Sequence, residues 1–168
     1  LIMKMNHLAP KLFLVLFINF SLTAQQSIDS KVADLLSKMT LEEKIGQMNQ
    51  YNGFWNFTGP SPEGGDAKVK YEHLRKGLVG SMLNVRGVKD VRSVQKIAVE
   101  ESRLGIPLLF GFDLIHGYKT VFPIPLAEAA SWDLDAIQLS AQLAAKEAAA
   151  AGINWTFAPM VDITRDAR

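Results

Sequence analysis

An acidic residue follows an apolar run at Asp113, and a histidine stands three residues later at His116, with Gly111 and Gly117 on either side. Removing a carboxylate from water is costly, so an acid at the end of an apolar run needs hydrogen-bonding partners. The spacing leaves two interpretations open. Asp113 accepts hydrogen bonds from the hydroxyl groups of a bound substrate, or it caps the backbone of its own loop. His116 is more typical of a packing histidine than of a base or a metal ligand.

A second group of charged residues ends the chain in the order Asp162, Arg165, Asp166, Arg168. Such a run of mixed sign favours ion pairs that shape a rim loop over the binding of an anion. If Asp113 and Asp162 follow neighbouring strands, these strands lie about 4.8 Å apart. That spacing is close to the carboxylate separation of a retaining glycosidase, so a catalytic pair of Asp113 and Asp162 stays open as a hypothesis.

Several other chemistries have no support in the sequence. The chain has no cysteine, which excludes disulfide scaffolds, thiolate metal sites and cysteine nucleophiles. Its histidines (His7, His73, His116) lack metal-ligand spacing, so no metal is expected. No phosphate-binding glycine loop or nucleophile elbow occurs, and no cofactor is expected. The balance of 18 Lys and Arg against 17 Asp and Glu gives no reason to expect a nucleic-acid partner.

Apolar periodicity predicts the elements that must position these groups. Helices are expected over residues 27–39, from Thr40 onward, over 88–103 and over 133–151, with Thr40 and Glu43 forming a capping box. Strands are expected over 80–84, 108–113 and 153–158, and loops over 49–66 and 115–131. The aromatic cluster from Tyr51 to Phe57 lies in the first loop, where it either packs the loop or stacks on a sugar ring.

Alternation of strands and helices predicts an α/β fold with a parallel sheet, either doubly wound or closed into a barrel. No dinucleotide-binding glycine motif follows a strand, and polar residues stand just past the strand ends at Asn84, Asp113 and Asp162. Both features favour a (β/α)8 TIM barrel, whose active site lies at that rim. Only about three of the eight strand–helix units are expected here, so the chain resembles the N-terminal part of a larger domain.

The first residues have the pattern of a targeting signal. Lys4 and Lys11 precede an apolar run over 12–18, and the segment ends in the small residues Thr23 and Ala24. This run is too short for a membrane span, which needs about 20 residues, although an uncleaved anchor is the alternative. We therefore predict a signal peptide over 1–24, a barrel domain over 25–168, no membrane span after signal removal, and export to the periplasm or the medium.

Several motifs occur in a fixed order along the chain. They are Lys38–Met48, Ser102–Pro107, Asp113–Gly117, Thr120–Pro123, Ala158–Asp162 and Arg165–Arg168. Together they resemble the family 3 glycoside hydrolases, specifically the exported bacterial β-glucosidases. This resemblance implies a (β/α)8 barrel followed by an α/β sandwich domain.

The resemblance also implies roles for individual residues. Asp113 matches the aspartate that binds hydroxyls of the non-reducing glucose, and Arg165 and Arg168 are expected to shape the rim. Ala167 stands where the family usually has proline. The family's nucleophilic aspartate and its acid/base glutamate are expected downstream of Arg168, which argues against Asp113 and Asp162 as the catalytic pair.

The expected activity is hydrolysis of terminal non-reducing β-D-glucosyl residues by a retaining mechanism, with a β-linked oligosaccharide or glucoside as substrate. The missing C-terminal part of the same polypeptide is the expected partner, and the 168-residue chain alone is expected to be inactive. Alternatives are a β-xylosidase of the same family, a noncatalytic sugar-binding or pseudoenzyme fragment, and an unrelated exported α/β enzyme that uses Asp113 and Asp162.

Overall fold

The computed structural model describes residues 27–53 and 65–161, which fall into two units divided between Lys38 and Met39. The predicted signal peptide over 1–24 lies outside the described residues. Within the described part of the chain, every helix is too short or too polar to cross a membrane.

The first unit contains helix α2, Ile28–Lys38, which confirms the helix predicted over 27–39. Ser27 begins it, because its hydroxyl accepts a hydrogen bond from the Ser30 amide at 3.1 Å. Asp34 and Lys38 form an ion pair one turn apart at 2.6 Å.

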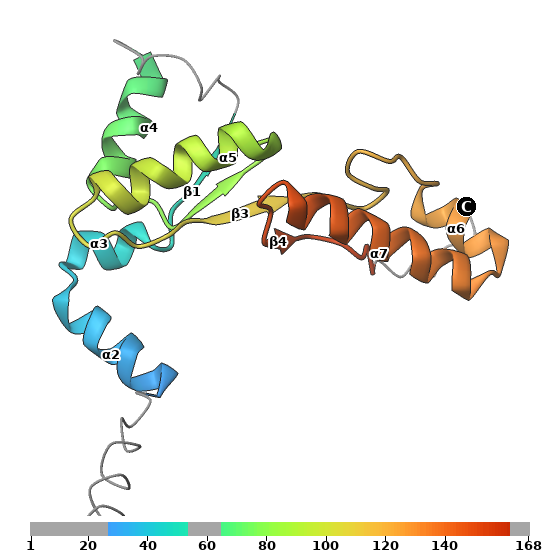
Figure 1. The fold of residues 1–168 in the computed structure, drawn as a ribbon, viewed down its shortest axis with the longest axis horizontal. Coiled ribbons are helices and arrows are strands. Elements are labelled where there is room, and N and C mark those ends of the chain that lie inside the picture. The colour runs from blue at the N-terminus through green and yellow to red at the C-terminus, as the bar shows by residue number, and fades with distance from the viewer. Residues whose placement is uncertain (1–26, 54–64, 162–168) are drawn as a thin grey trace, which may run out of the picture. The chain divides into compact units, whose positions relative to one another are not determined.

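The second unit is built on a parallel sheet of four strands in the order β1-β2-β3-β4 (Figure 1). The strands are β1 Gln50–Asn52, β2 Ser81–Leu83, β3 Leu109–Phe112 and β4 Trp155–Thr156. In the register, Leu83 lies beside Gly111, and Gly111 lies beside Trp155. Strand order therefore follows chain order, as expected for consecutive right-handed β–α–β units.

Helices connect the strands, and the short helix α3, Leu41–Gly46, precedes β1. Between the strands lie α4 Gly65–Arg75, α5 Gly87–Lys96 with the π-helical turn η1 Ile97–Glu101, α6 Pro125–Ser131 and α7 Leu134–Ala150. The capping box predicted at Thr40 and Glu43 is present. Helix α7 begins after Asp133, whose side chain accepts a hydrogen bond from the Ala136 amide at 2.9 Å.

The core lies on one face of the sheet, against α4, α5 and η1. Met82 of β2 and Phe110 of β3 are almost fully buried there, together with Leu74 of α4 and Val94 of α5. Side chains alternate between the two faces of a strand, so Leu83, Leu109 and Gly111 belong to the opposite, open face. Asp113, which follows β3, continues that open row.

The prediction of a parallel α/β fold with about three strand–helix units is confirmed, but of the four described strands β1 was not predicted. Strand β1 and the start of α4 fall in the stretch 49–66 that was expected to be a loop, and α6 falls in the expected loop 115–131. Gln50–Asn52 and Gly65–Arg75 carry few apolar residues, so neither shows a clear period. The third predicted strand, 153–158, shortens to Trp155–Thr156.

Candidate functional site

The carboxyl ends of the parallel strands meet at one edge of the sheet, and polar side chains gather there. Asn52 ends β1, Asn84 follows β2, Asp113 follows β3 and Thr156 ends β4. In parallel α/β folds this edge is where ligands bind, because the loops after the strands are free to vary while the sheet holds them in place.

Asp113 is exposed, in contrast to Phe112 and Leu114 on either side of it, which are buried. Its carboxylate forms no hydrogen bond or ion pair with any side chain or backbone group in residues 27–53 and 65–161. Within that part of the chain, the predicted alternative in which Asp113 caps its own loop is therefore absent. The carboxylate is left to accept hydrogen bonds from other groups.

Aromatic and apolar side chains meet at Gly111, two residues before Asp113, on the open face of the sheet. Continuing the pairing of Gly111 with Trp155 by one step along each open row sets Asp113 opposite Phe157. A Cβ atom placed on Gly111 would lie 3.2 Å from the Phe157 ring and 3.6 Å from Leu83, so all three meet at this point. The Trp155 and Phe157 rings have centroids 4.9 Å apart and are about 40% exposed.

Asn84, in the loop after β2, is held at this edge through its side-chain amide and its backbone amide. Asn84 donates a hydrogen bond from its side-chain nitrogen to Oδ1 of Asn52 at 3.2 Å, and its backbone amide donates to the Gly111 carbonyl at 3.1 Å. Asn84 has φ 61°, a left-handed conformation that asparagine tolerates better than most residues. Arg86 follows, with its guanidinium 5.0 Å from the centre of the Phe112 ring.

The loop that begins at Asp113 is held by its own backbone and by Glu147 of α7. The Phe122 amide donates to the His116 carbonyl at 2.8 Å, and Gly117 pairs with Val121. Gly117 has φ 106°, and a Cβ atom there would overlap the Thr120 carbonyl, so this turn requires glycine. The Glu147 carboxylate accepts hydrogen bonds from Thr120, and these lower the pKa of Glu147.

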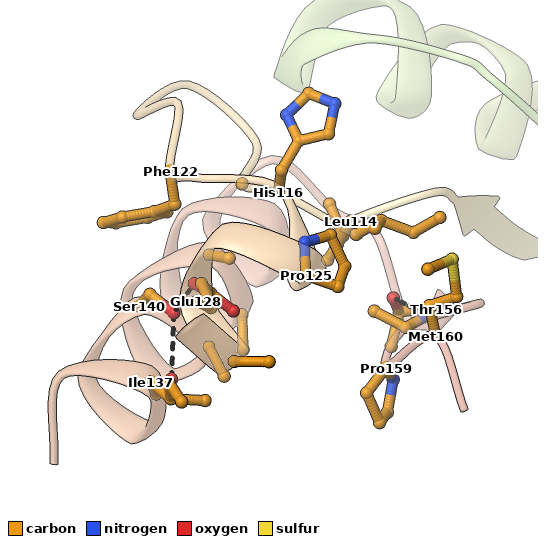
Figure 2. Close-up of a pocket in the computed structure, with 17 residues that line it drawn as sticks. Leu114, His116, Phe122, Pro125, Glu128, Ile137, Ser140, Thr156, Pro159 and Met160 are labelled. Atoms are coloured by element: carbon orange, nitrogen blue, oxygen red, sulfur yellow. Dashed lines mark hydrogen bonds between the residues drawn. The ribbon is translucent and has the colours of Figure 1, made fainter. Parts of the chain in front are cut away.

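A cavity of about 390 Å³ lies beside this loop, between it, α6, α7 and the residues after β4 (Figure 2). Its lining is mostly apolar and includes Leu114, Phe122, Pro125 and Met160, together with His116 and Thr156. Its polar part includes Glu128, which accepts a hydrogen bond from the Ser140 hydroxyl at 2.6 Å. Asp113 does not line this cavity. The cavity and the Asp113 carboxylate are therefore separate features.

The opposite edge, where the strands begin, brings together two of the sequence motifs. Glu43 of the first motif and Arg103 of the second form an ion pair with Nη2 and Oε2 2.5 Å apart, and Nε donates to Oε1 at 3.0 Å. Glu43 also accepts from the Thr40 amide at 2.9 Å. The Arg103 guanidinium is the largest cause that holds the pKa of Glu43 below its ordinary value.

The other residues singled out by the sequence have mixed outcomes. Asp162, Arg165 and Arg168 lie outside the described residues, so the Asp113–Asp162 pair stays a hypothesis, although β3 and β4 are neighbours as expected. Tyr51 is half-buried, and its hydroxyl lies 2.5 Å from Nδ1 of His73. The rest of the aromatic cluster is not described. Within 27–53 and 65–161, no cluster of three or more acidic or histidine side chains is placed to hold a metal.

Sequence reasoning missed Glu147 and Tyr118, which hold the loop after Asp113. The Tyr118 hydroxyl accepts a hydrogen bond from the Gly87 amide at 3.1 Å, and its ring packs edge-on against Phe112. Glu147 gave one weak signal, since it is the single acid in the alanine-rich end of α7. Its partners are 27 and 28 residues away, which no local pattern reveals.

Known proteins resemble this chain in sequence. The family model described as "Glycosyl hydrolase family 3 N terminal domain" matches residues 40–168. A "Periplasmic beta-glucosidase" of Salmonella typhimurium is 41% identical over 159 residues, which cover 95% of this chain and 20% of that protein. A "Putative beta-xylosidase" of Formosa agariphila is 31% identical, covering 89% and 21%.

The fold matches that of a solved structure as well. The crystal structure of a beta-glucosidase from Listeria innocua in complex with isofagomine superposes with a TM-score of 0.67 and 42% identity. The match covers 83% of this chain and 19% of that one. The chain thus spans about one fifth of the length of the relatives it matches.

Proposed function

The chain belongs to glycosyl hydrolase family 3, whose N-terminal domain it matches over residues 40–168, and we propose that it supplies the sugar-binding strand ends of a β-glucosidase. Its four parallel strands form part of a TIM-barrel-type domain. The reaction is hydrolysis of terminal non-reducing β-D-glucosyl residues. The substrate is a β-linked oligosaccharide or glucoside.

The observation that carries this proposal is the Asp113 carboxylate. It is exposed at a strand end, has no partner among the described residues, and comes two residues after Gly111, where Phe157 and Leu83 meet on the open face. A carboxylate accepts hydrogen bonds from sugar hydroxyls, and apolar side chains suit the C–H faces of a sugar ring. Asp113 therefore binds and orients the terminal glucose.

Bond making and breaking are assigned to other residues. In a retaining glycosidase one carboxylate attacks the anomeric carbon, and a carboxylic acid protonates the leaving oxygen and then activates water. The resemblance puts both groups downstream of Arg168. Arg165 and Arg168 themselves would shape the rim of the site. The residues described here thus serve binding, and the 168-residue chain alone is expected to release no product from an aryl β-glucoside.

Export is part of the proposal. Residues 1–24 would be a signal peptide, and residues 25–168 would form the first part of the barrel domain. The name of the Salmonella typhimurium relative, "Periplasmic beta-glucosidase", supports export. N-terminal sequencing of the protein produced in a bacterial host would test it, and a mature protein that retains residues 1–24 would contradict it.

Substitution of Asp113 tests the proposed role in the complete gene product that contains this chain. Asp113→Asn keeps the shape of the side chain but removes its charge, so kcat/KM for an aryl β-glucoside should fall by about 100-fold. The midpoint of unfolding should not change, because the carboxylate has no partner among the described residues. Asp135→Asn, at an exposed position in the first turn of α7, is the matched control. A loss of less than threefold in Asp113→Asn would contradict the role.

A β-xylosidase is the second candidate, because the Formosa agariphila relative bears that name. Glucose differs from xylose by its hydroxymethyl group, so the two activities separate on paired aryl glycosides. A higher kcat/KM on the β-xyloside than on the β-glucoside would favour this alternative. Binding of glucose without turnover of either compound would instead favour a noncatalytic sugar-binding protein.

A further inference from the structure

We propose that Glu147 is a positioning residue for the substrate site: it fixes the loop 113–122 and thereby sets the place of the Asp113 carboxylate. This inference rests on the proposed sugar-binding role of Asp113. Glu147 is on α7, 34 positions along the chain from Asp113, and does not act on the substrate itself. Its contacts are with the tip of the loop.

Glu147 accepts three hydrogen bonds from two consecutive residues of the loop. The Lys119 amide and the Thr120 amide each donate to Oε2 at 2.8 Å, and the Thr120 hydroxyl donates to Oε1 at 2.7 Å. Both carboxylate oxygens are therefore engaged. Hydrogen bonds to an ionised acceptor are shorter and stronger than those between neutral groups, so the contact is suited to holding a loop in one conformation.

The loop transmits this restraint to its base over a short distance. Thr120 is followed by Val121, which pairs with Gly117, and by Phe122, whose amide donates to the His116 carbonyl at 2.8 Å. The Gly117 amide donates in turn to the Leu114 carbonyl at 3.4 Å. The chain of contacts thus runs from Glu147 to the residue next to Asp113.

A second anchor holds the loop to another helix. The Tyr118 hydroxyl accepts from the Gly87 amide at the start of α5, and the Tyr118 ring packs on Phe112. Tyr118 therefore fixes the loop against the start of α5 and the end of β3, whereas Glu147 fixes it against α7. Since the two anchors are on adjacent loop residues, loss of Glu147 should loosen the tip rather than unfold the domain.

The ionised state of Glu147 suits this role. Its pKa is held below the ordinary value by the Thr120 hydroxyl first, then by the backbone amides and by the nearby Lys119 ammonium. A glutamine of the same shape would present one oxygen and one NH₂ group to three donors. Glu147→Gln therefore removes the charge that strengthens these hydrogen bonds and loosens the anchor, while leaving the volume of the side chain nearly unchanged.

The test uses the complete gene product and an aryl β-glucoside. In Glu147→Gln we expect KM to rise by about tenfold while kcat changes by less than about threefold, because the loop must be ordered when substrate binds. Amide hydrogen exchange in residues 117–122 should become faster. Thr120→Val, which removes one of the three donors, should raise KM by about threefold, and Thr120→Ser should restore it.

Glu101→Gln is the matched control, because Glu101 also accepts a hydrogen bond from another element, with Arg75 Nε 2.7 Å from its Oε2. It lies on η1, before β3 begins, and its loss should leave KM and exchange in the loop unchanged. An unchanged KM in Glu147→Gln would overturn the proposal. So would a fall in kcat that accompanies a lower midpoint of unfolding, because both would then report a general loss of structure. An inactive wild type would refute the proposed function instead, and hydrogen exchange would then still decide whether Glu147 anchors the loop.

Discussion

The two edges of the parallel sheet are built from different interactions. At the edge where the strands begin, the backbone segments are in close contact and charged groups are paired. At the edge where they end, polar side chains are exposed or half-buried, and one carboxylate has no partner among the described residues. Both edges contain sequence motifs through which the chain resembles its family.

The first edge is packed too tightly to admit another atom at some positions. A Cβ atom on Gly80 would overlap the backbone of Gln47, and one on Gly46 would overlap that of Leu78. Glu43, only 7% exposed, is paired with Arg103 across 60 residues of sequence. These contacts join α3 to the segments before β2 and β3, so this edge serves the assembly of the sheet.

The second edge contains, within the described part of the chain, an unpaired charge and a disfavoured backbone conformation, neither of which stabilises the fold. Asp113 is exposed, and Asn84 has a left-handed backbone that costs about 1 kcal/mol in most residues. Such exceptions gather where a protein binds ligands. A motif shared with a family of enzymes therefore need not be catalytic: the motif with Glu43 joins segments of the fold, whereas the motif with Asp113 is the one that we propose binds substrate.

A glycine-to-alanine substitution should destabilise the protein most at the first edge and much less at the second. Gly80→Ala should lower the free energy of unfolding by about 3 kcal/mol, because a backbone carbonyl cannot move aside. Gly111→Ala should cost less than about 1.5 kcal/mol, since its Cβ would meet only side chains, the nearest being the Phe157 ring. Urea unfolding monitored by circular dichroism measures both. Equal losses would show that the two edges do not differ in packing.

Glu43→Gln tests the charged part of the first edge. Because the pKa of Glu43 is lowered in the folded state, its stabilisation is present above the ordinary pKa of glutamate and is lost as the pH falls through the lowered value. The variant should melt about 5 °C below the wild type at pH 7, and the gap should close in acid. Calorimetry from pH 7 to pH 3 measures this.

A matched surface pair gives the control for Glu43. Glu100 lies 3.6 Å from Lys96, and both side chains are at least 60% exposed. Glu100→Gln should change the melting temperature by less than about 2 °C at any pH, because water screens such pairs. A gap for Glu43→Gln that stays constant with pH would show that its charge does not stabilise the fold.

Much of the fold could be predicted because its signals are local. An apolar run that ends in an acid predicted a strand over 108–113, and β3 is Leu109–Phe112. Apolar spacing predicted the helix over 133–151, now α7, and the helix over 88–103, now α5 and η1. Strand β1 was missed because it has three residues and takes its hydrogen bonds from β2, far along the chain.

The site was predictable only in part, for the same reason. Asp113 was recognised from its position after an apolar run, a property of neighbouring residues. The contacts of Glu147 with Thr120 and of Tyr118 with Gly87 depend on how α7 and α5 pack beside the loop. The partners are 27 and 31 residues apart, and helical periodicity says nothing about which helix meets which loop.

The smallest expected effect concerns Asn84 at the second edge. Asn84→Ala loses the hydrogen bond to Asn52 and leaves an alanine at φ 61°, so it should lower the free energy of unfolding by about 1.5 kcal/mol. Asn84→Gly loses the same bond but relieves the backbone, and should cost about 0.5 kcal/mol. Urea unfolding of both variants and of Asn52→Ala separates the cost of the lost hydrogen bond from the cost of the left-handed backbone. If glycine costs as much as alanine, the left-handed backbone at Asn84 stores no strain, and the described part of the second edge has no conformation that folding disfavours.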